Sequence, residues 1–357
     1  MDKITKFIEC LLPVTACNLK CSYCYIIQEG RRKQETFKLS HSPEFIAKAL
    51  SKKRLGGICY ISICGAGETL IPEDSTKLIK AILEEGHYVN VTTNGTLEHR
   101  FDEIIKWPKE ILQRLHFAFS FHYLELKRTK NVERFFKNIK KIKNAGCSFL
   151  VQINLCDDYI PYLDDIKKLC IENVGALPQV AATRDEEKEK IQIKTKYSDA
   201  EYYNIGKQFN SNLFDFTMKN FMVKRCEFCY AGKWAFALNL QTGELKQCYF
   251  QEVLQNIYED INEPIKTKAV GKECNNAFCT NSSHYMSLGI IPSIKTPTYY
   301  ELRNREGANW YNDKMASFLS SKLYDTNKKY SVFQEELLNI KYFIKSNLRK
   351  IKHKLID

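Results

Sequence analysis

The sequence predicts an α/β protein whose parallel sheet is open-wound or curled into part of a barrel. Six short β-like runs alternate with amphipathic helical segments over residues 7–182, and strands that alternate with helices form parallel sheets. The chain of 357 residues is 44% apolar and 27% charged, which is ordinary for a globular protein with a sizeable core. Because no run of 18 apolar residues occurs, we expect no membrane partner.

The expected strands are apolar runs of strand length at residues 7–14, 58–64, 88–93, 115–121, 148–154 and 176–182. The expected helices show apolar residues at i, i+3 and i+4 with charges opposite, and they cover residues 43–53, 73–86, 97–108, 132–146 and 162–173. Functional residues of parallel sheets gather at the carboxyl ends of the strands. We therefore expect the site in the loops that follow these runs.

The remainder of the chain divides by composition. Residues 183–200 are highly charged and predict a linker or an exposed segment, followed by a helical stretch, a second group of cysteines and a Lys- and Asn-rich tail. We expect a core domain at residues 1–195, a small cysteine-rich domain at 196–295 and a helical tail at 296–357.

The charge balance is basic, since Lys and Arg exceed Asp and Glu by 12. Such an excess favours an anionic partner, for example a nucleotide-sugar, a phosphate or a nucleic acid. Part of the excess has a simpler explanation, because the C-terminal segment has the pattern of a solvated basic helix face. That face would carry Lys341, Lys345, Arg349, Lys350, Lys352 and Lys354.

Fourteen cysteines occur without an export signal, so we expect a cytoplasmic protein whose cysteines are metal ligands, catalytic thiols or buried apolar groups. Cys17, Cys21 and Cys24 share one short loop directly after the first expected strand. Three thiolates can hold three corners of a 4Fe–4S cube and leave the fourth iron open. Structural zinc, the alternative, needs four closed ligands, and the sequence has no fourth Cys or His nearby.

This CxxxCxxC loop, with Tyr23 before its third cysteine, resembles the signature of the radical S-adenosylmethionine (SAM) enzymes. The later strand ends extend the resemblance. Gly65-Ala66-Gly67-Glu68-Thr69 is similar to the family's GGEP turn, which binds the amino group of SAM, although Ala and Thr replace Gly and Pro. Further candidate contacts to SAM or substrate follow the next three strands, namely Asn94 in a TNGT turn, Ser120 and His122 in a Ser-x-His element, and Asn154.

The resemblance implies a partial (β/α)6 TIM-like barrel that binds a 4Fe–4S cluster and SAM. In this family an external donor such as flavodoxin or ferredoxin reduces the cluster. SAM is then cleaved to a 5′-deoxyadenosyl radical, which abstracts a hydrogen atom from substrate. Arg128 is the nearest basic candidate for the SAM carboxylate. His122 is either a catalytic residue or a buried core histidine, and Asn94 taken singly is also a residue that a tight turn requires.

The second cysteine group begins at Cys229, and Thr242-Gly243 predicts a hairpin turn that brings Cys248 beside it. With Cys274 and Cys279, this region resembles the SPASM and twitch extensions of radical SAM enzymes. Its five cysteines are too few for two clusters, so the resemblance implies one auxiliary 4Fe–4S cluster held by Cys229, Cys248, Cys274 and Cys279. Cys226 is then an alternative ligand, a hydrogen-atom donor or a structural residue. A zinc ribbon is the alternative for the whole group.

Three functions follow from these patterns. The first is a radical SAM enzyme that oxidises, epimerises or dehydrates a small anionic or sugar-like substrate. The second is a radical SAM enzyme that modifies a ribosomally made short peptide. The third is a basic zinc protein that binds nucleic acid, although the aromatic and Arg clusters of single-strand binders are not evident.

Overall fold

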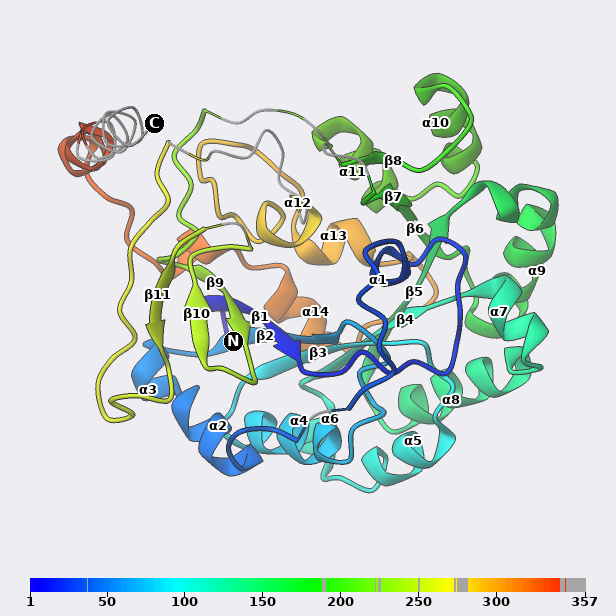
Figure 1. Ribbon diagram of the computed structural model, residues 1–357, viewed down its shortest axis with the longest axis horizontal. Coiled ribbons are helices and arrows are strands. Elements are labelled where there is room, and N and C mark those ends of the chain that lie inside the picture. The colour runs from blue at the N-terminus through cyan, green and yellow to red at the C-terminus, as the bar shows by residue number, and fades with distance from the viewer. Residues whose placement is uncertain are drawn as a thin grey trace.

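In the computed structural model, the described residues are 1–36, 38–187, 191–221, 223, 226–249, 251–272, 274, 282–340 and 344. Among them, nine strands form one sheet in the order β11-β10-β9-β1-β2-β3-β4-β5-β6 (Figure 1). Helices α2, α4, α5 and α8 cover one face of this sheet, while α11, α12 and α13 lie on the opposite side. No helix in the described ranges is long and apolar enough to cross a membrane.

The strands of the main sheet are β1 (Lys6–Leu12), β2 (Cys59–Gly65), β3 (Tyr88–Thr93), β4 (Leu115–Ser120), β5 (Ser148–Leu155), β6 (Gln179–Ala182), β9 (Ala235–Asn239), β10 (Glu244–Lys246) and β11 (Val253–Asn256). A separate hairpin pairs β7 (Arg184–Asp185) with β8 (Gln192–Ile193). The helices of the first half are α1 (Tyr25–Gln28), α2 (Pro43–Ala49), α3 (Lys52–Leu55), α4 (Asp74–Glu84), α5 (Glu98–Ile104), α6 (Lys109–Leu112), α7 (Tyr123–Arg128), α8 (Val132–Asn144), η1 (Asp157–Tyr162) and α9 (Leu163–Val174). Later come α10 (Asp199–Lys207), α11 (Asn212–Asn220), α12 (Ser282–Tyr285), α13 (Tyr299–Arg303), α14 (Asp313–Leu319) and η2 (Leu323–Asp325).

Strands β1 to β6 pair in parallel with their sequence neighbours, which confirms the predicted α/β fold and its six strands. The sixth strand is shorter than expected and begins at Gln179. Pro178 explains the difference, because proline has no N–H to donate to a sheet. The sheet also extends beyond β1, where β9 pairs in parallel with β1 and β10 continues antiparallel.

The segment expected as a tail returns to the core. The ring of Phe318 in α14 stacks on Tyr88 with centroids 3.7 Å apart, and Tyr299 in α13 contacts Tyr60 edge-on at 5.2 Å. The backbone N–H of Phe149 donates to the carbonyl of Trp310 at 2.9 Å. One hydrophobic cluster therefore spans the expected boundaries at 195 and 295, and those boundaries stay predictions. All six basic residues of the expected C-terminal helix face lie outside the described residues.

Candidate active site

A cavity of about 390 Å³ opens at the carboxyl ends of the parallel strands. Its lining brings together the predicted site residues at the ends of five successive strands, namely Cys17, Cys21, Tyr23, Cys24, Gly65, Ala66, Gly67, Glu68, Asn94, Ser120, His122 and Asn154. These residues are separated by up to 137 positions in sequence, from Cys17 to Asn154. They share one cavity because parallel strands deliver their loops to the same edge of the sheet.

The three thiols of the first loop lie close enough to act on one another. Burial raises the pKa of Cys21, and the neighbouring thiols of Cys17 and Cys24 raise it further because like charges disfavour ionisation. A cationic iron–sulfur core would reverse both effects, so this donor set fits a cluster that binds thiolates. No group of three or more His, Cys, Asp or Glu side chains in the described ranges is arranged to hold a metal ion. Three thiols leave a tetrahedral zinc ion one ligand short, whereas they can occupy three corners of a cubane, so the number of ligands suits the cluster better than zinc.

The Gly65–Thr69 turn packs directly against the chain that leads into the cysteine loop. The backbone N–H of Gly67 donates to the carbonyl of Val14, and that of Glu68 donates to Ala16, both at 2.8 Å. A Cβ on residue 67 would lie 2.0 Å from the carbonyl oxygen of Ala16. Glycine at this position therefore permits the contact that joins the two loops.

The carboxylate of Glu68 connects this turn to the end of β3. It is 3% exposed, and it accepts hydrogen bonds from the hydroxyl of Thr93 and the backbone N–H of Asn94, both at 2.7 Å, and from the N–H of Leu70 at 3.1 Å. Burial raises its pKa, and these donors oppose the rise by stabilising the charged form. The side chain thus organises two loops, which leaves the backbone of residues 65–67 to face the cavity.

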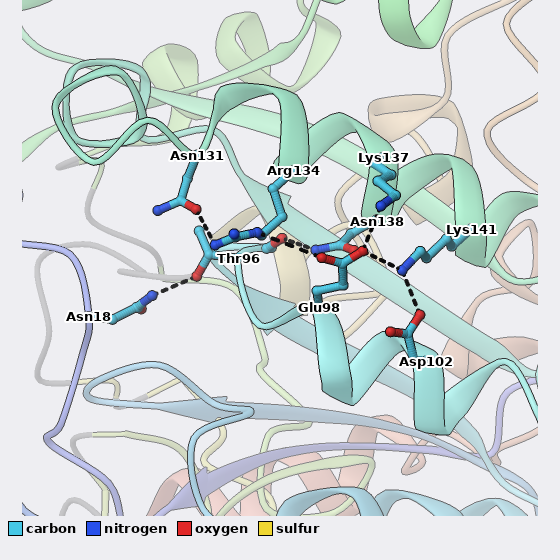
Figure 2. A network of polar contacts seen from close by, with 10 residues as sticks. Asn18, Thr96, Glu98, Asp102, Asn131, Arg134, Lys137, Asn138 and Lys141 are labelled. Atoms are coloured by element: carbon cyan, nitrogen blue, oxygen red, sulfur yellow. Dashed lines mark hydrogen bonds and ion pairs between the residues drawn. The ribbon is translucent and has the colours of Figure 1, made fainter.

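Asn94 fastens the TNGT turn to the cysteine loop. Its Nδ2 donates to Oδ1 of Asn18 at 2.8 Å and lies 3.8 Å from the sulfur of Cys17. Asn18 in turn donates to the hydroxyl of Thr96 at 2.7 Å, and Asn138 of α8 donates to the carbonyl of Gly95 at 2.8 Å (Figure 2). Turn and loop therefore form one hydrogen-bonded unit.

A second set of contacts tethers the cysteine loop to the ends of β4 and β5. The hydroxyl of Tyr23 lies 2.6 Å from Nδ1 of His122 and 3.0 Å from the hydroxyl of Tyr159. Burial lowers the pKa of His122 to about 4, so the imidazole is neutral near pH 7. Of its two expected roles, the buried hydrogen-bonded histidine matches these contacts, although its ring also lines the cavity.

The ends of β4 and β5 offer polar groups to a ligand. Ser120, Gln152 and Asn154 line the cavity, and their side chains have no hydrogen-bond partner among the described residues. Arg128 does not line this cavity; it lies on α7, where its guanidinium pairs with Glu125 at 2.7 Å and is 61% exposed. Arg32 does line it, and its Nη2 donates to the carbonyl of Cys17 at 2.8 Å.

The described cysteines of the second group lie outside the cavity lining. Burial raises the pKa of Cys229 to about 12, and the neighbouring thiols of Cys248 and Cys274 contribute to the rise, which places the three sulfurs near one another. Cys226 is exposed. Cys279 lies outside the described residues. Of the four cysteines expected to hold the auxiliary cluster, the structure therefore describes Cys229, Cys248 and Cys274.

Sequence reasoning missed several polar and ionisable groups of the cavity. Glu9, His284, Tyr299 and Arg303 all belong to the lining. Glu9 offered one signal, because a carboxylate interrupts an apolar run that was expected to be a buried strand. His284 and Arg303 offered none, since they come from segments that were assigned to other domains.

Comparisons with known proteins agree with this geometry. Residues 11–168 match the Radical SAM superfamily. A crystal structure of Streptococcus suis SuiB bound to S-adenosylmethionine is similar with a TM-score of 0.52 and 18% identity, over 73% of this chain and 65% of that chain. SuiB bound to its precursor peptide SuiA gives a TM-score of 0.51 and 18% identity over 72% of this chain and 63% of that one. The chain thus spans less than two thirds of the SuiB chains.

A third structure, native anSMEcpe with bound AdoMet and Kp18Cys peptide, has a TM-score of 0.51 and 15% identity over 90% of this chain and 96% of that chain. No curated protein sequence matches. At these identities the structural likeness concerns the fold, and it confirms the α/β partial-barrel architecture. The family match by itself shows a radical SAM superfamily domain over residues 11–168, which is less than half of the chain.

Proposed function

We propose that the protein is a radical SAM enzyme that cleaves SAM reductively and abstracts a hydrogen atom from a bound substrate. One observation carries the proposal: the three thiols of the first loop, the Gly65–Thr69 turn and the polar ends of β4 and β5 line a single cavity. A 4Fe–4S cluster with bound SAM would supply an electron to the sulfonium and thereby a carbon-centred radical.

Each part of the cavity has a distinct role in this proposal. Cys17, Cys21 and Cys24 would hold the cluster. The backbone carbonyls of residues 65–67 would bind the amino group of SAM, and Arg32, which lies beside the cysteine loop, is better placed for its carboxylate than Arg128. Ser120 and Asn154 would orient the ribose or the substrate. A bound substrate would displace water from the cavity, which would protect a reactive radical from side reactions.

Two substrate classes are compatible with this cavity. A small anionic or sugar-like molecule suits the basic balance of the chain and the cavity volume of about 390 Å³. A short peptide is favoured by a different observation, since structures of similar fold hold the peptides SuiA and Kp18Cys. In both cases we propose an external one-electron donor such as flavodoxin or ferredoxin.

We further propose that Cys229, Cys248 and Cys274, together with Cys279, hold one auxiliary 4Fe–4S cluster of the twitch type. The mutual proximity of the first three thiols supports it. Tyr249 is partly buried. Burial raises its pKa, and the charges of Glu9, Cys64 and Cys248 raise it further, so Tyr249 lies near these cavity residues as well as near Cys248. The auxiliary site therefore adjoins the wall of the cavity.

The test is SAM cleavage by the anaerobically reconstituted, dithionite-reduced protein. We expect 5′-deoxyadenosine and methionine from the native chain and from Cys147→Ala, a control at a buried cysteine that lies outside the cavity. We expect none from the triple variant Cys17→Ala, Cys21→Ala and Cys24→Ala. Cleavage that survives the triple change would refute the proposed site, and a colourless protein that binds zinc would favour the nucleic-acid-binding alternative.

A further inference from the structure

The cavity continues below the level of the expected cluster and SAM sites. The strand registers align Glu9 with Ser62, Ser62 with Asn90, and Asn90 with His116, so these residues form one polar layer across four strands. Glu9 precedes the end of β1 by three residues, a depth of roughly 10 Å at about 3.3 Å per residue. A ligand at this depth lies on the substrate side of the cavity.

Arg303 supplies an uncompensated cation to this deep layer. It is 2% exposed and lines the cavity. Its guanidinium lies 3.8 Å from the centroid of the Tyr299 ring, and Nη1 donates to the carbonyl of Ser283 at 3.2 Å. Among the described residues no carboxylate lies within ion-pair distance of it, and no other acceptor bonds to it. Burial raises the pKa of Tyr299 and the charge of Glu9 contributes to the rise, so Tyr299 lies near Glu9 as well as against Arg303.

Another buried arginine shows what a purely structural guanidinium looks like in this chain. Arg54 is 6% exposed, and its three nitrogens donate to the backbone carbonyls of Ala49, Ile257, Glu259, Asp260 and Glu263. Five acceptors replace the lost water there. Arg303 has only one such acceptor among the described residues, the carbonyl of Ser283. Because a buried cation without partners is costly, the N–H groups of Arg303 that lack an acceptor indicate that a ligand binds there.

Glu9 limits the charge that this ligand can carry. Its Oε1 accepts from the hydroxyl of Ser62 at 3.1 Å and from the thiol of Cys64 at 3.4 Å. Its Oε2 has no hydrogen-bond partner in the described ranges and lies 3.4 Å from Nδ1 of His284, close enough for an ion pair but not aligned for a hydrogen bond. The Glu9 carboxylate would repel a dianionic phosphate bound to Arg303. A monoanion that also carries an O–H or N–H donor suits both residues, because the anion can pair with Arg303 while the donor bonds to Glu9.

We propose that Arg303 binds a carboxylate group of the substrate at the deep end of the cavity, with Glu9 accepting a hydrogen bond from a donor on the same molecule. The proposal rests on the proposed function, which places SAM above this layer. A planar guanidinium matches a carboxylate through two parallel hydrogen bonds. The carboxylate belongs either to a small acid or to the C-terminus of a peptide, and the recognition chemistry is the same.

The experiment is anaerobic calorimetric titration of the reconstituted protein at saturating SAM, so that the SAM carboxylate site is filled. The probes are N-acetylglycine and its neutral analogue N-acetylglycinamide, an acetylated pentaglycine as free acid and as amide, and inorganic phosphate. We expect each carboxylate that binds to do so at least tenfold more tightly than its amide. Arg303→Met should remove this preference, and Arg54→Met, outside the cavity, should retain it.

The outcomes separate the possible ligands. Binding of the pentaglycine acid shows a peptide C-terminus, and binding of N-acetylglycine alone shows a small acid. Equal binding of acids and amides, tighter binding of phosphate, or an unchanged preference in Arg303→Met would overturn the proposal. Carboxylate binding does not need SAM cleavage, so a protein that binds the acids but forms no 5′-deoxyadenosine would refute the proposed function alone.

Discussion

The contact between Gly67 and Ala16 gives the most direct structural prediction, through Gly67→Ala. The added Cβ would lie 2.0 Å from the oxygen and 2.6 Å from the carbon of the Ala16 carbonyl, where ordinary contact begins at 3.4 Å. Both atoms belong to the backbone, so no side chain can rotate to relieve the overlap. The Gly65–Thr69 turn must therefore move away from the cysteine loop.

The cost has two parts. Overpacking of this kind costs about 1–3 kcal/mol. Separation of the two loops also weakens the hydrogen bonds from Gly67 to Val14 and from Glu68 to Ala16, each of which contributes about 1 kcal/mol. We expect the free energy of unfolding to fall by about 2–5 kcal/mol, and SAM to bind at least tenfold more weakly, equivalent to about 1.4 kcal/mol.

The assays are urea unfolding and SAM titration of the reconstituted protein. Gly307→Ala is the matched control, because residue 307 has a φ of +74° but no atom within 4 Å of the added Cβ. It should cost about 1–2 kcal/mol from backbone strain alone and leave SAM affinity unchanged. A Gly67→Ala protein as stable as this control, with native SAM affinity, would refute the proposed packing of the two loops.

Three further predictions concern the surroundings of the site. Tyr23→Phe removes the hydroxyl that contacts His122 at 2.6 Å and should cost about 1–3 kcal/mol in urea unfolding because a buried partner is left unpaired; native stability would contradict this contact. Burial lowers the pKa of His87 to about 4, so the folded state disfavours its protonation. The free energy of unfolding should therefore fall as pH drops from about 6.5 to 4, and it should be about 2 kcal/mol lower at pH 5 than at pH 7. His87→Gln should flatten that slope, exposed His99→Gln should not, and equal slopes would argue against the buried neutral ring. Cys248→Ala should lose about half of the roughly eight iron atoms expected for two cubanes, while SAM cleavage persists. An unchanged iron content would refute the proposed auxiliary cluster.

The fold could be predicted from sequence because each strand is a local apolar run and each helix a local periodic pattern. The rim of the cavity was predictable for a related reason. Cys17, Gly67 and Asn94 belong to short motifs, and the parallel topology brings all strand ends to one edge. The sequence therefore predicted which residues line the rim and at which strand ends they lie. The hydrogen bonds that fix the loops to one another could be found only in the structure.

The deep layer was not predictable, because its contacts join residues far apart in the chain. Glu9 and His284 are 275 positions apart, and no local pattern links them. The same holds for the extension of the sheet, since the pairing of β9 with β1 depends on how the cysteine-rich region folds back. Arg128 looked suitable from its place after β4, yet a nearby Glu125 holds it at the surface.

The central claim is that the three thiols of the first loop hold a cluster with one iron open to SAM. Electron paramagnetic resonance of the reduced, reconstituted protein tests it directly, because coordination of SAM changes the environment of that iron. We predict a signal of a reduced 4Fe–4S cluster whose g values shift when SAM is added, present in Cys248→Ala and absent from the triple cysteine variant. A native spectrum with no component that responds to SAM, or a SAM-dependent shift that persists in the triple variant, would contradict it, whereas a signal that ignores SAM in the triple variant belongs to the auxiliary cluster.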